Sequence, residues 1–166
     1  TGNVGRKTIE ILEKSNISIN NLFVVASKKS AGKKILFKKK ELTIELLDTY
    51  DFSKAEITIF AASSQIAKEW ALKASKQTIV IDNSSYFRME KNIPLVVPEV
   101  NPEALEKHKN IISNPNCSTI QMVLALKPLH DEYDIKRIIV STYQAVSGAG
   151  KAAMDELFAQ SRDYLN

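Results

Sequence analysis

Short apolar runs alternate with helical periodicity along the first two thirds of the chain. Residues 22–26 and 57–62 are apolar runs bounded by polar and turn-forming residues, a pattern typical of buried strands. Residues 3–14 and 63–76 carry apolar side chains at helical spacing, and Ser63-Ser64 is a suitable helix start. Further strands are expected at residues 35–37, 42–47, 78–81 and 110–113.

Strands that alternate with helices predict an α/β fold, a Rossmann-like doubly wound parallel sheet with helices on both faces. In such sheets, ligands bind beyond the carboxyl ends of the strands. Polar clusters follow four of the predicted strands, after Ala26, Ala62, Ile81 and Ser113. The sequence therefore predicts a ligand site at this edge of the sheet.

The pattern changes after residue 116. A helix is expected from Cys117 to about His130, a long strand over residues 135–146, and a helical tail from Ala149. We expect residues 1–116 to form the first domain and residues 117–166 the incomplete beginning of a second. The chain opens directly on a glycine turn and stops within a helix, so we expect truncation at both ends, with the first strand of the sheet missing.

The opening Thr1-Gly2-Asn3-Val4-Gly5, followed by a helix, resembles the last part of a dinucleotide fingerprint, in which glycines let a pyrophosphate approach the helix N-terminus. An NAD site usually has an acidic residue about 20 residues further on, which binds the ribose hydroxyl groups. That place holds the segment 27–30, Ser-Lys-Lys-Ser, whose cations suit a 2′-phosphate. NADP is therefore favoured over NAD. The alternative is a pair of solvated lysines on a surface loop.

Cys117 lies in a segment that predicts a reactive thiol. Pro115 disfavours helical geometry in the residue before it, and Asn116 is a good N-cap, so Cys117 falls in the first turn of a helix. A helix N-terminus favours the thiolate, which is the reactive form. The alternative is a buried structural cysteine, which the polar neighbours disfavour.

Composition narrows the class of protein. The chain is 44% hydrophobic and 25% charged, as in soluble globular domains. Its net charge of +4 is too small to predict binding to nucleic acid. A single cysteine forms no disulfide within the chain, and no apolar stretch approaches the ~20 residues that span a bilayer. Without a recognisable signal peptide, a cytoplasmic location is the default expectation.

Six motifs match, in order, those of one enzyme family. They are TGNVG, ASKKSAGK from Ala26, VIDNSSYFRM from Val80, LVVPEVN from Leu95, SNPNCSTIQM from Ser113 and STYQAVSGAG from Ser141. The sequence resembles the aspartate-semialdehyde dehydrogenase family over essentially its whole length. The stretches around Cys117 and Gln144 are the most specific.

The resemblance implies an NADP-dependent, phosphorylating oxidoreductase. Such an enzyme reduces L-aspartyl 4-phosphate to L-aspartate 4-semialdehyde, on the route to lysine, threonine, methionine and diaminopimelate. It implies that Cys117 forms a thioester with the substrate and that Asn116 lies beside the reacting centre. It also implies that the second domain is an α+β catalytic and dimerisation domain, and that the intact protein is a homodimer or homotetramer.

The resemblance assigns further site residues. Arg88 matches the phosphate-binding arginine, although a lone arginine is commonly a surface residue. Gln144 matches the residue that holds the substrate near the cysteine, although a glutamine within a strand often just faces solvent. Matches to cofactor-binding positions are Thr1, Gly2, Asn3, Val4, Lys29, Ser30, Ser147 and Gly148.

The sequence departs from the family pattern at two places. Lys29 stands where the family usually has arginine, which weakens the expected preference for NADP. Ser63-Ser64 replaces a glycine-rich turn near the cofactor.

The family's general acid–base histidine, its substrate-carboxylate arginine and a second phosphate-site lysine are expected downstream of Gly150. His108 and His130 do not match the catalytic position, so we expect this chain alone to be inactive. Two alternatives stay open: a non-catalytic dinucleotide-binding module, and a related cysteine reductase with another acyl phosphate as its substrate.

Overall fold

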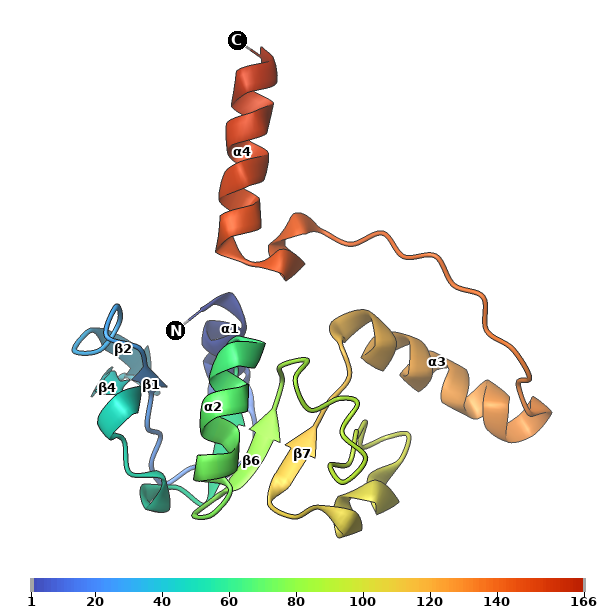
Figure 1. Cartoon of the computed structure of the whole chain (residues 1–166), viewed down its shortest axis with the longest axis horizontal. Coiled ribbons are helices and arrows are strands. Elements are labelled where there is room, and N and C mark those ends of the chain that lie inside the picture. Colours follow the sequence, from blue (N-terminus) through green and yellow to red (C-terminus); the bar gives the residue numbers. More distant parts are fainter. Residues whose placement is uncertain (1, 166) are drawn as a thin grey trace.

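The computed structural model describes residues 2–165, so the predicted cofactor contact Thr1 lies outside the described residues (Figure 1). Four α-helices form: α1 (Asn3–Lys14), α2 (Ser64–Ala74), α3 (Cys117–Tyr133) and α4 (Lys151–Leu165). The three predicted helices that precede the tail begin where their sequences indicate. Short 3-10 helices lie at η1 (Leu47–Thr49), η2 (Phe52–Lys54), η3 (Pro102–Lys107) and η4 (Val146–Ala149).

A three-stranded parallel sheet is the centre of the fold. It consists of β5 (Ile57–Phe60), β6 (Ile79–Asp82) and β7 (Ile111–Ser113), in that order. The register pairs the last residues of neighbouring strands: Phe60 lies opposite Asp82, and Asp82 lies opposite Ser113. The carboxyl ends of all three strands therefore lie at one edge. The α/β class and the parallel sheet are confirmed.

Two smaller sheets lie beside this centre. β1 (Val25–Ala26) pairs in parallel with β4 (Glu45–Leu46), and β2 (Lys34–Phe37) forms an antiparallel hairpin with β3 (Lys40–Thr43). Only the last two residues of the apolar run 22–26 pair as a strand. Lys38 and Lys39 form the turn at the tip of the hairpin.

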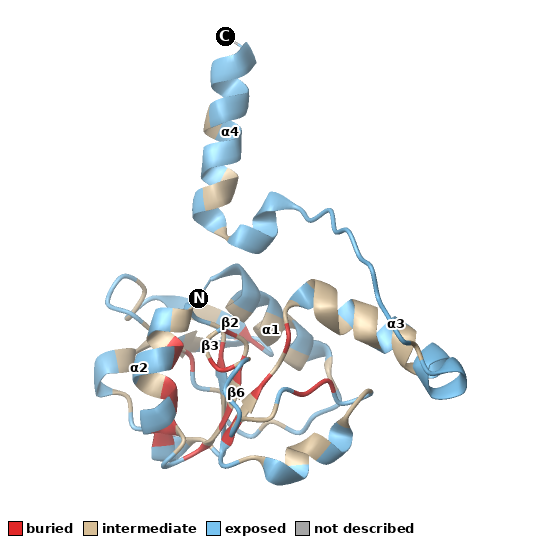
Figure 2. Cartoon of the chain, turned by 45° about the vertical axis from the view of Figure 1, so that its right-hand side comes forward, coloured by how far each residue is buried: buried red, intermediate tan, exposed pale blue. Residues whose placement is uncertain are grey.

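The core lies between α2 and the central sheet (Figure 2). Ala67, Ala71 and Ala74 are 0% exposed, because three methyl groups on one helical face let α2 approach the sheet closely. Trp70 packs against the edge of this cluster and lies 6.4 Å from Phe52, centroid to centroid. Aromatic and apolar side chains complete it: Phe52, Phe60, Val80, Phe87 and Ile111.

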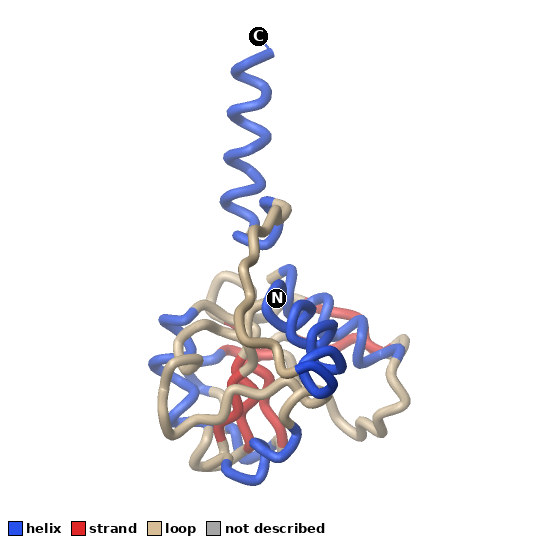
Figure 3. The backbone as a smooth tube through the Cα atoms, turned by 90° about the vertical axis from the view of Figure 1, so that its right-hand side faces the viewer, coloured by secondary structure: helices blue, strands red, loops and turns tan. Residues whose placement is uncertain are grey.

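The strand predicted over residues 135–146 is wrong. Residues 135–145 run as an extended connection between α3 and η4, with no hydrogen-bonded partner strand among the described residues (Figure 3). Ile139 is 83% exposed and Tyr143 is 100% exposed. A β-branched sequence favours extended backbone, but a strand also needs a neighbour that accepts its main-chain hydrogen bonds. Beyond this connection, α4 stands apart from the sheet (Figure 1).

Candidate active site

The loop after β7 presents Cys117 as the first residue of α3. Asn116 is the N-cap, because its side-chain oxygen accepts a hydrogen bond from Thr119 N at 3.2 Å. Its amide nitrogen also donates to Ser118 Oγ at 2.9 Å. The thiol is exposed, so the alternative of a buried structural cysteine is wrong. The cap and the helix start agree with the sequence-based interpretation.

Gln144 reaches the thiol from the extended connection. Its Nε2 donates to Cys117 Sγ at 3.4 Å, across 27 residues of sequence. A donor at this position supports negative charge on sulfur. The side chain therefore does more than face solvent, and the structure brings together two residues that the sequence had placed in one site.

Arg88 is hydrogen-bonded to the loop that joins β7 to α3. Its Nε donates to the main-chain oxygen of Asn114 at 3.0 Å, and its Nη2 donates to that of Asn83 at 3.2 Å. Neither partner is a carboxylate, and Arg88 enters no ion pair within residues 2–165. Carbonyl oxygens thus fix the guanidinium, and no carboxylate of the described residues lies within ion-pair distance of it. A half-buried cation held this way is suited to an anionic ligand.

The turn after β6 is built around Asp82, which sequence reasoning did not single out. This carboxylate is 0% exposed and accepts from Ser84 N at 3.0 Å and from Ser84 Oγ at 2.7 Å. Ser84 Oγ in turn accepts from Tyr86 N at 3.1 Å. An Asp two residues before a Ser, directly after an apolar strand, is the signature of such a turn and was the available signal. The turn directs the chain toward Arg88.

The glycine turn meets the same edge of the sheet. Gly2 is the N-cap of α1 and supplies no side-chain cap, so the first N–H groups of the helix are open to an anion. A Cβ on Gly5 would lie 3.7 Å from the Cβ of Ala61, just beyond β5, so α1 begins beside the end of that strand. Ser64 Oγ and Ser85 Oγ, 2.8 Å apart, join the start of α2 to the turn after β6. A continuous series of contacts thus follows the carboxyl edge.

The remaining predicted cofactor contacts lie in two turns. Lys29 is exposed and Ser30 half-buried in a turn closed by a hydrogen bond from Ser30 N to Ser27 O at 2.9 Å. Ser147 and Gly148 lie in η4, directly before α4. Asn3 Nδ2 lies 4.0 Å from Met154 Sδ, which places the first turn of α4 beside the first turn of α1. Val4 lies in that turn of α1 and is exposed.

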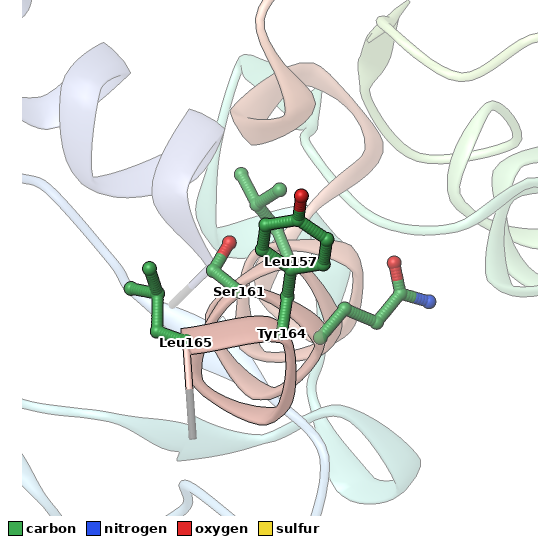
Figure 4. Close-up of a pocket in the computed structure, with 5 residues that line it drawn as sticks. Leu157, Ser161, Tyr164 and Leu165 are labelled. Atoms are coloured by element: carbon green, nitrogen blue, oxygen red, sulfur yellow. The ribbon is translucent and has the colours of Figure 1, made fainter.

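Other features of the described residues do not add to this site. A hollow on α4 is lined by Leu157, Gln160, Ser161, Tyr164 and Leu165 of that helix alone and is a groove on its surface (Figure 4). Residues 2–165 hold no group of three His, Cys, Asp or Glu side chains able to bind a metal ion. Within the same range, each helix is too short or too polar to cross a membrane.

Two family descriptions match the chain. "Semialdehyde dehydrogenase, NAD binding domain" matches residues 1–108, and "Semialdehyde dehydrogenase, dimerisation domain" matches residues 126–166. Aspartate-semialdehyde dehydrogenase 2 of Vibrio cholerae is 47% identical over 100% of this chain and 50% of its own length. The Aquifex aeolicus aspartate-semialdehyde dehydrogenase is 51% identical over 98% of this chain and 49% of its own. The chain thus spans about half the length of the curated relatives that it matches.

Solved structures give the same result. The V. cholerae aspartate semialdehyde dehydrogenase II, complexed with ASA, aligns with a TM-score of 0.95 at 46% identity, covering 100% of this chain and 50% of that one. The Candida albicans enzyme with NADP aligns with a TM-score of 0.66 at 27% identity, covering 80% and 45%. The chain therefore belongs to the semialdehyde dehydrogenase family, and its sequence is similar to that of the aspartate-semialdehyde dehydrogenases.

Proposed function

We propose that the complete protein is an aspartate-semialdehyde dehydrogenase that reduces L-aspartyl 4-phosphate to L-aspartate 4-semialdehyde with NADPH. One observation carries the proposal: an exposed cysteine begins α3, with a glutamine donor 3.4 Å from its sulfur. Arg88, in the segment after β6, is hydrogen-bonded to the loop that leads to Cys117 and has no ion-pair partner among the described residues. The names of relatives that are about half identical over the whole chain support this choice of substrate.

In the proposed reaction, the Cys117 thiolate attacks the acyl carbon of the substrate. A carbon–sulfur bond forms, the carbon–oxygen bond to phosphate breaks, and phosphate leaves with that electron pair. Arg88 stabilises the leaving phosphate, because a guanidinium binds several of its oxygens at once. Gln144, which contacts the sulfur, and Asn116, which directly precedes Cys117, orient the acyl group in this proposal. The resulting thioester splits one difficult step into two easier ones.

NADPH, when bound, supplies the hydride that reduces the thioester, after which the carbon–sulfur bond breaks and the aldehyde leaves. The uncapped start of α1 and the loop cations fit the pyrophosphate and the 2′-phosphate of this cofactor. Lys29 binds the 2′-phosphate as a single charge without the planar fork of arginine, so some use of NAD is expected. The residues proposed to hold the cofactor are Thr1, Gly2, Asn3, Val4, Lys29, Ser30, Ser147 and Gly148.

We propose that the protein works as a cytoplasmic homodimer or homotetramer assembled through its second domain, with the domain boundary at residues 116/117. The dimerisation-domain match over residues 126–166 supports this arrangement. Within the described residues, none from 116 to 165 is buried, so this part of the chain retains apolar surface for further contacts. The 166-residue chain alone is expected to be inactive, because neither of its histidines matches the family's acid–base position.

The test follows the reaction in reverse. The complete protein is mixed with aspartate semialdehyde and NADP⁺, first without and then with inorganic phosphate. Without phosphate, a burst of about one NADPH per site and an acyl adduct on the Cys117 peptide are expected; phosphate then starts steady turnover. Turnover with another semialdehyde in preference to this one would instead favour a related reductase. Absence of both the burst and turnover would favour a non-catalytic dinucleotide-binding module.

A further inference from the structure

One side chain at the edge of the sheet has no part in the chemistry described above. Asn83 follows β6, and its Oδ1 accepts a hydrogen bond from Asn114 Nδ2 at 2.8 Å. Asn114 follows β7, 31 residues later in the sequence. The amide pair therefore joins the turn that leads to Arg88 to the loop that leads to Cys117.

The same two residues hold the guanidinium. Arg88 donates to the main-chain oxygens of both Asn83 and Asn114, so the three residues form a closed ring of hydrogen bonds. Below the ring, Asn114 N donates to Asp82 O at 3.3 Å, and Asp82 pairs with Ser113 in the sheet. Without the amide pair, the two segments would be joined, apart from Arg88 itself, through their backbones alone, and the guanidinium would be held less firmly in its orientation.

The amide also has an electrostatic advantage over a carboxylate. An aspartate at position 83 would still accept from Asn114, but it would add a negative charge next to Arg88. That charge would compete with an anionic ligand for the guanidinium. Asparagine fixes the geometry and leaves the positive charge available.

We infer that Asn83 is a positioning residue, which orients Arg88 for the phosphate group through its bond to Asn114. This inference rests on the proposed function, in which Arg88 binds phosphate. It predicts that Asn83 affects the use of phosphate more than the use of the nucleotide.

The test measures the phosphate and NADP⁺ dependence of aspartate semialdehyde oxidation by the complete protein. Asn83→Ala is expected to raise the KM for inorganic phosphate about tenfold, the loss of one hydrogen bond near a charge, with the KM for NADP⁺ within about twofold of its starting value. Asn114→Ala breaks the same bond. In the double variant, the KM for phosphate is therefore expected to exceed that of the more impaired single variant by no more than about twofold, because the effects of coupled positions are not additive.

Two further variants separate the possible outcomes. Asn101→Ala is the matched control: this asparagine also ties a loop, through hydrogen bonds with Leu95 O and Val97 N at 2.9 Å each, but it does not contact Arg88. It is expected to leave the KM for phosphate unchanged. Arg88→Lys tests the underlying role and is expected to raise that KM by more than Asn83→Ala does.

An unchanged KM for phosphate in Asn83→Ala, with a large increase in Arg88→Lys, would overturn the positioning role and leave the proposed function standing. An unchanged KM in both variants would overturn the phosphate role of Arg88 and the inference with it. Multiplicative effects in the double variant would show that Asn83 and Asn114 act separately, which also contradicts the inference.

Discussion

The buried core and the reactive thiol lie in different parts of the chain. Every buried side chain of the described residues lies between Val24 and Pro115, and the core cluster spans residues 52–111. From residue 116 to residue 165 no side chain is buried, yet this part contributes Cys117, Gln144 and the η4 turn. The first part therefore contains the buried core and also contributes Arg88, whereas the second part contributes the thiol and its glutamine donor from exposed positions. Substitutions in the two parts should therefore separate effects on the unfolding free energy from effects on turnover.

The largest expected effect is a loss of turnover that leaves the unfolding free energy almost unchanged. Cys117→Ser in the complete protein is expected to reduce turnover by at least about a thousandfold, because a hydroxyl is a far weaker nucleophile than a thiolate. Its unfolding free energy should stay within about 0.5 kcal/mol of the parent, since the side chain is exposed. Steady-state assays and urea unfolding measure the two quantities. A large loss of stability would contradict the division between the two ends.

The reverse effect is expected in the core. Phe60→Ala removes a buried ring that stacks 6.3 Å from Phe52, centroid to centroid, and should cost about 3–5 kcal/mol of unfolding free energy. The matched control is Phe158→Ala on α4, where the ring is 67% exposed and the expected cost is below about 0.5 kcal/mol. Fluorescence of Trp70, the single tryptophan of the 166-residue chain, reports unfolding in urea. Equal losses of unfolding free energy in the two variants would contradict the expected difference in stability between the two parts of the chain.

Two helix caps allow a closer comparison of the two parts of the chain. Ser63 caps α2 through a bond to Ile66 N at 3.5 Å, and Asn116 caps α3 through a bond at 3.2 Å. Alanine at either position should cost about 1 kcal/mol of stability, the usual loss for a missing N-cap. Only Asn116→Ala is expected to lower turnover strongly, because its helix carries the thiol. Similar losses of activity in both variants would argue that the caps act on the site through stability alone.

The smallest expected effect is electrostatic. Hydrogen bonds to Lys14 and Lys7 lower the pKa of Glu10 from 4.5 to about 2. Because the folded-state pKa is depressed, the stabilisation of α1 is full above pH 4.5 and is lost as the pH falls through about 2. Glu10→Gln should therefore lower the urea midpoint slightly near neutral pH and not at pH 2, less so at high salt. Glu103→Gln is the control, because this carboxylate in η3 is exposed and forms no ion pair among residues 2–165. A pH-independent effect of Glu10→Gln, or the same effect from the control, would contradict this cause.

Local signals explain what the sequence predicted well. The starts of α2 and α3 follow from the capping residues directly before them, and the strands of the central sheet follow from short apolar runs. The strand expected over residues 135–146 fails because pairing depends on a neighbour, which a local pattern does not contain. The ring of Asn83, Arg88 and Asn114 joins segments about 30 residues apart through the register of β6 with β7. No single segment encodes it. The assigned roles of the site residues stay predictions until they are measured.

The alanine face of α2 has a consequence for the edge of the sheet. Three methyl groups with no exposed area fix the distance between this helix and β6 by contact alone, and Ser64 at its start meets Ser85. Steric contact does not depend on ionic strength or proton concentration. The spacing between the start of α2 and the turn that leads to Arg88 should therefore persist across buffers that change the charge of surface side chains. A larger residue at Ala71 would act as a wedge and move one turn away from the other.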